Sequence, residues 1–127
     1  MPMVNVIRGA EAPQFELPGV RFTGLAAPSR GSRQVCTWRI TVAPGLESDQ
    51  SHRIDRDEVF MVTSGRLRIT PDGEEIHPGD AVTVPAGEPI ALANPGEEPA
   101  EAYIAIAAGF TATMADGTHV ATPPWAQ

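Results

Sequence analysis

Apolar residues along this chain recur mostly with a period of two, in short runs. Residues 35–43 read V-C-T-W-R-I-T-V-A, and in residues 66–70 arginines alternate with Leu67 and Ile69. No long stretch free of Pro and Gly carries the three-four apolar repeat of an amphipathic helix. Because successive side chains of a strand point to opposite faces, this pattern predicts a protein built from β-strands.

Prolines and glycines separate these apolar runs and mark the turns between strands. The 127 residues include 13 Pro and 12 Gly, which are dispersed along the chain. Further strands are expected at residues 58–63, 74–77, 81–84, 90–94 and 101–107, with weaker candidates at 4–7 and 20–25. About nine short strands joined by turns are typical of an all-β sandwich or barrel.

The length fits one domain over residues 1–127. We expect an N-terminal arm at 1–33 that is partly extended and wraps the barrel surface, a barrel at 35–107 and a C-terminal tail at 111–127. The pair Pro123-Pro124 should keep helix out of the tail.

The strand predicted at residues 58–63 indicates association between copies of the chain. Val59, Phe60, Met61 and Val62 are consecutive apolar residues, so both faces of this strand need cover. One face can fill a barrel, whereas the other needs a second sheet or another subunit. Because small single-domain barrels commonly pair, we expect a homodimer.

Charge and composition argue against several classes of partner. The net charge is −7 and the acidic residues are scattered, so the basic patch that nucleic acid requires is missing. No apolar run is long enough to cross a bilayer, and the first residues do not resemble a secretory signal. We therefore expect a cytoplasmic protein without nucleic-acid or membrane partners. The single cysteine, Cys36, lies in an apolar run and is expected to be a buried structural thiol.

Two segments, 45–65 and 79–94, each carry a spaced set of residues: His52, Glu58 and Gly65 in the first, and Gly79, Pro85, Gly87 and Asn94 in the second. These two sets resemble the two signature motifs of the cupin superfamily. The resemblance implies an all-β double-stranded β-helix, the cupin or jelly-roll barrel, with a small-molecule pocket inside. Where the family has its second and third histidines, this chain has Ile54 and Ile90.

These two isoleucines bear on metal binding. In metal-dependent cupins, three imidazoles and one carboxylate converge on an ion, and a catalytic metal site needs at least three protein ligands. Only His52 and Glu58 remain here, so we expect no tightly bound metal and no other cofactor. The alternative is a divalent transition metal held by His52, Glu58 and one further ligand. The candidates for that ligand are Asp57, His77 and His119.

The candidate catalytic residues are His52, Glu58 and Tyr103. A buried carboxylate without a partner costs several kcal/mol, roughly, so Glu58 is expected to pair with His52, orient the imidazole and raise its pKa. In this scheme His52 transfers a proton and Tyr103 completes an acid–base pair. Each residue also has a plain structural interpretation: a satisfied polar histidine, a solvated carboxylate and a tyrosine in the core. A shifted register, with Ser51 and Arg53 inward, would leave no histidine in the site.

The walls of the pocket are expected to come from residues that share the inward face of their strands. These are Trp38, Ile54, Phe60, Ile90 and Leu92. Three functional hypotheses follow from the resemblance. The first is a small-molecule-binding cupin without a tight metal, which, if catalytic, performs acid–base isomerisation, epimerisation or cyclisation. The second is a metal-dependent dioxygenase or lyase with an atypical ligand set. The third is a non-catalytic ligand-binding or structural barrel.

Overall fold

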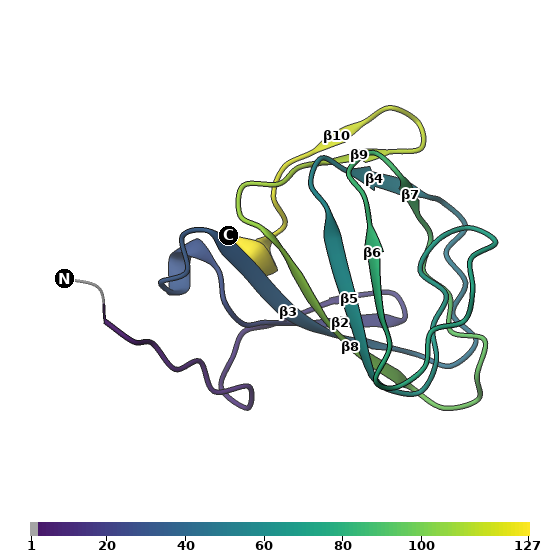
Figure 1. Ribbon diagram of the computed structural model, residues 1–127, viewed down its shortest axis with the longest axis horizontal. Helices are drawn as coiled ribbons and strands as arrows, with labels where there is room; N and C mark the ends of the chain where they lie inside the picture. The colour runs from purple at the N-terminus through teal and green to yellow at the C-terminus, as the bar shows by residue number, and fades with distance from the viewer. Residues whose placement is uncertain (1–2) are drawn as a thin grey trace.

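The computed structural model describes residues 3–127, and in it two antiparallel sheets face each other (Figure 1). The larger sheet has the order β1-β2-β3-β8-β5-β6. Its strands are β1 (Gln14–Leu17), β2 (Val20–Gly24), β3 (Val35–Val42), β8 (Ala100–Ala107), β5 (Glu58–Ser64) and β6 (Ala81–Val84). The smaller sheet, in the order β10-β9-β4-β7, comprises β10 (His119–Val120), β9 (Ala112–Met114), β4 (His52–Ile54) and β7 (Pro89–Ile90).

This arrangement is the expected all-β double-stranded β-helix, or jelly roll. The described residues contain no α-helix, and two 3₁₀ turns, η1 (Pro28–Arg30) and η2 (Pro124–Ala126), complete the elements. The proline pair in the tail therefore tolerates one turn of 3₁₀ helix, contrary to the expectation that helix is excluded. The reason is that Pro124 occupies the first position of the turn, where its missing N–H costs no hydrogen bond.

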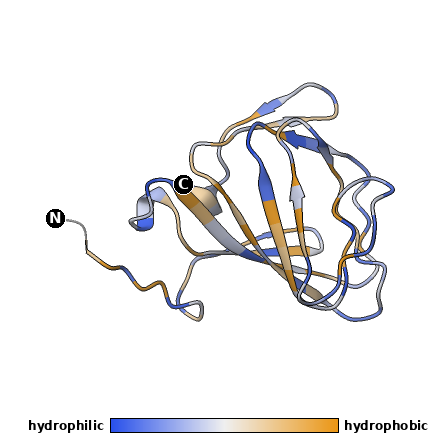
Figure 2. Ribbon diagram, viewed as in Figure 1, coloured by the Kyte–Doolittle hydropathy of each residue, from blue (hydrophilic) through white to orange (hydrophobic). Residues whose placement is uncertain are grey.

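The central strands bury one face because their sequences alternate. Along β3, Cys36, Trp38, Ile40 and Val42 are buried, and the residues between them are exposed or half-buried. Figure 2 shows the hydrophobic colour concentrated along β3 and β5, whereas many connecting loops are hydrophilic. The predicted period of two thus corresponds to one inward face on each strand.

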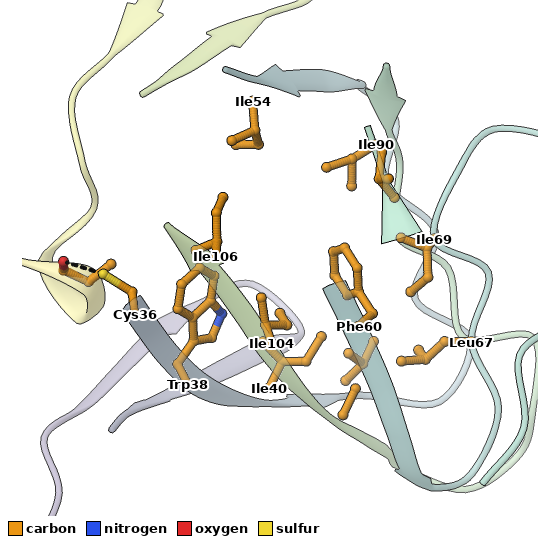
Figure 3. Packing of buried hydrophobic residues seen from close by; sticks show 14 of the residues in the cluster. Cys36, Trp38, Ile40, Ile54, Phe60, Leu67, Ile69, Ile90, Ile104 and Ile106 are labelled. Atoms are coloured by element: carbon orange, nitrogen blue, oxygen red, sulfur yellow. Dashed lines mark hydrogen bonds between the residues drawn. The ribbon is translucent and has the colours of Figure 1, made fainter. Parts of the chain in front are cut away.

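The core lies between the two sheets. In Figure 3, Ile54 and Ile90 project from the small sheet toward Phe60, Ile104 and Ile106 of the large sheet. The expected buried thiol is also present. Cys36 is fully buried and its thiol donates a hydrogen bond to the carbonyl oxygen of Ala126, drawn as a dashed line in Figure 3. Burial raises the pKa of this thiol.

Several peripheral elements differ from the sequence-based expectation. Residues 4–7 form no strand, and the expected strands at 66–70 and 74–77 meet only through a single bridge between Leu67 and Ile76. Within the segment expected to be a partly extended arm, residues 14–24 form a hairpin that extends the large sheet at β3, and its second strand, β2, matches the weaker candidate at 20–25. The residues before it project from the body (Figure 1), and the first two residues of the expected arm lie outside the described range.

Asn94 fixes the turn where the second motif ends. Its side chain is fully buried and donates to the carbonyl oxygens of Val42, at 3.1 Å, and Glu98, at 2.9 Å. Its own carbonyl oxygen accepts from the backbone N–H of Gly96 at 2.9 Å. Three hydrogen bonds therefore hold the loop between β7 and β8 against the end of β3.

The glycine that ends the first motif is required by its surroundings. Gly65 has a φ of 71°, and a Cβ at this position would lie 2.7 Å from the Cα of Ala100. Only glycine combines that left-handed conformation with so close an approach of the neighbouring chain.

One patch of the outer face of the large sheet remains apolar and partly exposed. Met61 of β5 pairs with Tyr103 of β8, and their exposed fractions are 38% and 36%. Val35, on the neighbouring strand β3, is 45% exposed but lies four residues from Arg39, which pairs with Tyr103. Within residues 3–127, no helix combines the length and apolar character needed to span a membrane.

The expected homodimer stays a prediction, and this face is where we place its contact. Substituting Met61→Arg should convert a dimer to a monomer, because a charge at the centre of an apolar interface would be desolvated. Sedimentation velocity of the wild type and the variant measures this. Val120→Arg is the matched control, since Val120 is 40% exposed but lies on β10 of the other sheet. A wild type that sediments as a monomer at high concentration contradicts the prediction.

Replacing the buried asparagine tests its structural role. Asn94→Ala leaves the carbonyls of Val42 and Glu98 and the amide of Gly96 without their partner. The free energy of unfolding should fall by about 2–4 kcal/mol, because buried polar groups lose their hydrogen bonds. Urea denaturation measures the change, with Thr63→Ala on the exposed side of β5 as the control. Equal losses in both variants would show that Asn94 has no special role.

Candidate functional site

A cavity of about 280 Å³ lies between the two sheets. Its size is at the small end of small-molecule sites, which are roughly 300–1,000 Å³. Its lining is apolar apart from a few polar atoms and comes from both sheets, the N-terminal hairpin and the tail. The lining residues are Leu17, Phe22, Trp38, Ile40, His52, Ile54, Glu58, Phe60, Ile90, Leu92, Ile104, Phe110, Ala112, Met114, Val120, Ala121, Pro123 and Trp125.

His52 and Glu58 enter this cavity from opposite sheets. His52 begins β4 in the small sheet, where it pairs with Ile90 of β7 and Met114 of β9. Glu58 begins β5 in the large sheet, where it pairs with Val84 of β6 and Ile106 of β8. Of the two registers considered for β4, the structure has the one with His52 and Ile54 inward, because both residues line the cavity while Arg53 is exposed.

The two side chains do not form the expected pair. Among residues 3–127 no hydrogen bond or ion pair joins His52 to Glu58, although both line the same space. The reason is topological, because β4 and β5 are consecutive in the chain but belong to different sheets. The expected rise in the pKa of His52 is also corrected. Burial without a nearby carboxylate lowers the pKa of this imidazole.

The carboxyl group of Glu58 is the most perturbed acid of the site. Glu58 is 4% exposed, and burial is the only influence on its carboxyl, to which no group within residues 3–127 donates a hydrogen bond. Burial raises the pKa of Glu58 from 4.5 to about 7, because the carboxylate loses solvation in an apolar environment. Near pH 7 the group therefore exists in both protonation states.

The residues that surround the cavity supply few ligands for a metal ion. Ile54 and Ile90 line it where the cupin motifs carry histidines, and their side chains supply no donor atoms. Within the described part of the chain, no group of three or more His, Cys, Asp or Glu side chains is placed to hold a metal ion. Among the described residues that line the cavity, only His52 and Glu58 carry an imidazole or carboxylate donor, which is fewer than the three ligands that a catalytic metal site needs.

The three proposed additional ligands lie elsewhere. The carboxylate of Asp57 accepts a hydrogen bond from the backbone N–H of Ala86 at 3.0 Å. His77 lies on an exposed loop with its Nε2 3.6 Å from a carboxylate oxygen of Glu75. His119 is exposed on β10, and its Nδ1 lies 3.3 Å from the hydroxyl of Thr113. None of the three lines the cavity.

Tyr103 is the candidate catalytic residue that the structure does not bring to the site. It alternates with Ile104 along β8, and Ile104 faces the cavity. Tyr103 consequently points to the outer face, where it pairs with Arg39 and Met61. The expectation that its hydroxyl completes an acid–base pair in the barrel is therefore corrected by the alternation of side chains.

All five expected wall residues line the cavity, but one end is built by residues that the motifs did not indicate. At this end Phe22 stacks on Trp125 with ring centroids 3.8 Å apart, and Trp38 lies 5.7 Å from Phe110. Phe22 belongs to the N-terminal hairpin and Trp125 to η2 in the tail. The only sequence signal for them was the presence of bulky aromatic residues in segments otherwise rich in Pro and Gly.

The buried carboxyl makes stability depend on pH. Because Glu58 holds its proton more tightly in the folded protein, its contribution is fully favourable below pH 4.5 and is lost as pH rises toward about 7. That loss amounts to about 3 kcal/mol. Glu58→Gln should remove it, so the variant gains stability over the wild type between pH 5 and pH 8. Urea denaturation across this range measures the difference.

The matched control is Glu97→Gln, which changes an exposed carboxyl. His52 also titrates in this range, but it is present in wild type and variant alike, so its contribution cancels in the difference. A difference between wild type and Glu58→Gln that stays constant from pH 5 to pH 8 would contradict the raised pKa of Glu58.

Solved structures of several proteins share this fold. A polyketide cyclase from Streptomyces resistomycificus superposes with a TM-score of 0.72 at 17% identity, over 83% of this chain and 80% of that one. A sugar phosphate isomerase of the cupin superfamily from Silicibacter pomeroyi gives 0.64 at 24% identity, over 87% and 81%. A salicylate 1,2-dioxygenase from Pseudoaminobacter salicylatoxidans gives 0.61 at 20% identity, over 74% of this chain and 26% of that one. At these sequence identities, the similarity shows a shared fold but does not identify a reaction.

Sequence comparison identifies the family. No curated protein matches the chain. Residues 38–106 match the family model described as a cupin domain. That segment covers more than half of the chain and contains both motifs with His52, Glu58 and Asn94. Together with the two facing sheets and the cavity between them, the match shows that this chain belongs to the cupin superfamily.

Proposed function

We propose that the cavity binds a small organic molecule and that Glu58 and His52 transfer protons to and from it. The observation that carries the proposal is the carboxyl of Glu58, which is buried at the cavity wall without a partner and has its pKa raised to about 7. A general base works best when its pKa lies near the working pH. Perturbed acids in a cavity are also typical of functional sites.

The positions of the two groups suit proton transfer at different atoms of one substrate. Glu58 as a carboxylate removes a proton from the carbon beside a carbonyl group. The C–H electron pair then forms an enolate, whose oxygen accepts a hydrogen bond from the neutral imidazole of His52 on the opposite sheet. Returning the proton from Glu58 to the far carbon of a conjugated dienolate moves a double bond and gives isomerisation. Attack of the enolate carbon on a second carbonyl of the substrate gives cyclisation, and the alkoxide that forms takes the proton held by Glu58.

The geometry of the cavity gives less support to a purely structural barrel and to a metal-dependent enzyme. A barrel without a binding function would be packed solid between Ile54, Ile90 and Phe60, whereas a cavity of about 280 Å³ lies there. A metal-dependent oxygenase or lyase needs donors that the cavity lining does not supply. The names of a cyclase and an isomerase among the similar structures agree with the proposed chemistry, but at these identities they add no weight to it.

The proposed chemistry can be tested before the natural substrate is known. The probe is 2-tetralone, an uncharged bicyclic ketone whose α hydrogens exchange with solvent deuterium and are followed by proton NMR. The wild type should accelerate this exchange over buffer. Glu58→Gln should lower the acceleration by at least about 100-fold, since general base catalysis contributes roughly 10²–10⁴-fold. Glu97→Gln, at an exposed site, should behave as the wild type.

Two results would overturn the proposal. The first is 2-tetralone exchange that is equally fast with wild type and Glu58→Gln. The second is about one transition-metal ion per chain in protein purified without added metal, lost in His52→Ala, since this would replace proton transfer by metal chemistry.

A further inference from the structure

We infer that the cavity selects an uncharged, largely apolar molecule that contains a carbonyl group and about one or two rings. This inference rests on the proposed function, because it names the substrate class of the same site. It follows from four features of the lining: its charge, its opening, its aromatic end and its size.

Among the described residues that line the cavity, none carries a cation that could neutralise an anionic substrate. The chain has nine arginines and no lysine. None of these arginines lines the cavity. The ionisable lining groups are His52, whose imidazole is kept neutral near pH 7 by burial, and Glu58. A phosphate or carboxylate would therefore lose its hydration without gaining a cation, and it would face the ionised fraction of Glu58.

The opening of the cavity is apolar. Leu17 of β1 and Val120 of β10 both line the cavity, and they are 55% and 40% exposed. They therefore mark the place where the cavity meets the surface. Large apolar side chains held in water at such a rim are typical of a site whose ligand is itself apolar. The side chains of these two residues offer a sugar phosphate no hydrogen bond as it enters.

The aromatic end is a fixed surface for a flat ring. Trp125 stacks on Phe22 with an interplanar angle of 11°. Its backbone carbonyl accepts a hydrogen bond from the guanidinium of Arg30 at 2.9 Å. The tail is further held by the Cys36 thiol and by the hydroxyl of Thr122, which donates to the carbonyl of Phe110 at 2.6 Å. These contacts make the tail a permanent wall of the cavity.

This end also carries unused hydrogen-bond donors. The indole N–H groups of Trp38 and Trp125 are buried and find no acceptor within residues 3–127. Orphaned buried donors are uncommon in folded proteins, and a ligand oxygen is one partner that such donors lack. The volume of about 280 Å³ leaves room for one ring system and excludes a large polycyclic ligand.

A matched pair of ligands tests the substrate class. The probes are 2-acetylnaphthalene, which is uncharged, and 2-naphthoate, which has nearly the same shape but a carboxylate in place of the acetyl group. Isothermal titration calorimetry of the full chain at pH 8 should show 2-acetylnaphthalene binding at least about tenfold more tightly than 2-naphthoate.

A filling variant locates the binding. Leu92 lines the cavity, whereas the neighbouring Ala91 does not line it and borders only a separate hollow, to which Leu92 also contributes. Leu92→Trp should abolish the binding of 2-acetylnaphthalene, and Ala91→Trp should leave it unchanged. Should Leu92→Trp fail to fold, Ala112→Phe fills the same cavity from β9.

The outcomes separate this inference from the proposed function. Equal or tighter binding of 2-naphthoate overturns the substrate class, as does binding of 2-acetylnaphthalene that survives both filling variants. Selective binding of 2-acetylnaphthalene without any Glu58-dependent exchange of 2-tetralone supports the substrate class and overturns the proton-transfer chemistry.

Discussion

The burial of one carboxyl group in a hydrocarbon environment is the constraint on which the site depends. Glu58 lies where β5 enters the core, and its neighbours across the strands are Val84 and Ile106. Removing an unpaired carboxylate from water is unfavourable, and proteins avoid it by pairing the charge or by keeping the proton. Here no cation or donor among the described residues pairs with it, so the proton is retained up to about pH 7.

The jelly-roll topology determines how this acid can act. Because β4 and β5 belong to different sheets, His52 and Glu58 face each other across the cavity without direct contact. A contacting pair would share one proton and act on a single substrate atom, whereas separated groups can act on two atoms of a bound molecule. The same topology places the hairpin 14–24 and the tail at one end of the cavity, where Phe22 and Trp125 form its aromatic wall.

The fold and the inward residues could be predicted from the sequence, because both depend on local patterns. The period of two defines which residues of β3 and β5 are buried, and Gly65 and Asn94 occupy turns that their chemistry requires. The partnership of His52 with Glu58 could not be predicted in this way. Their distance depends on the separation of two sheets, which no spacing of residues along the chain encodes.

Side-chain direction explains the remaining differences. Tyr103 points outward because it alternates with Ile104 along β8. Which of the two faces the core is known only when the pairing of β8 with β3 and β5 is known. The aromatic end was missed because Phe22 and Trp125 are far apart in the chain and meet only through the closure of the barrel. The substitution of Ile54 and Ile90 for histidines was visible in the sequence, and the structure adds that both side chains line the cavity.

The most direct test of this account is a titration of the Glu58 carboxyl itself. Carbon-13 NMR of the glutamate side-chain carboxyls, with the Glu58 signal assigned by its loss in Glu58→Gln, follows its protonation from pH 3 to pH 9. The account predicts a midpoint at about 7. A midpoint near the ordinary glutamate value of about 4.3 would contradict it, since the group would then be solvated or paired.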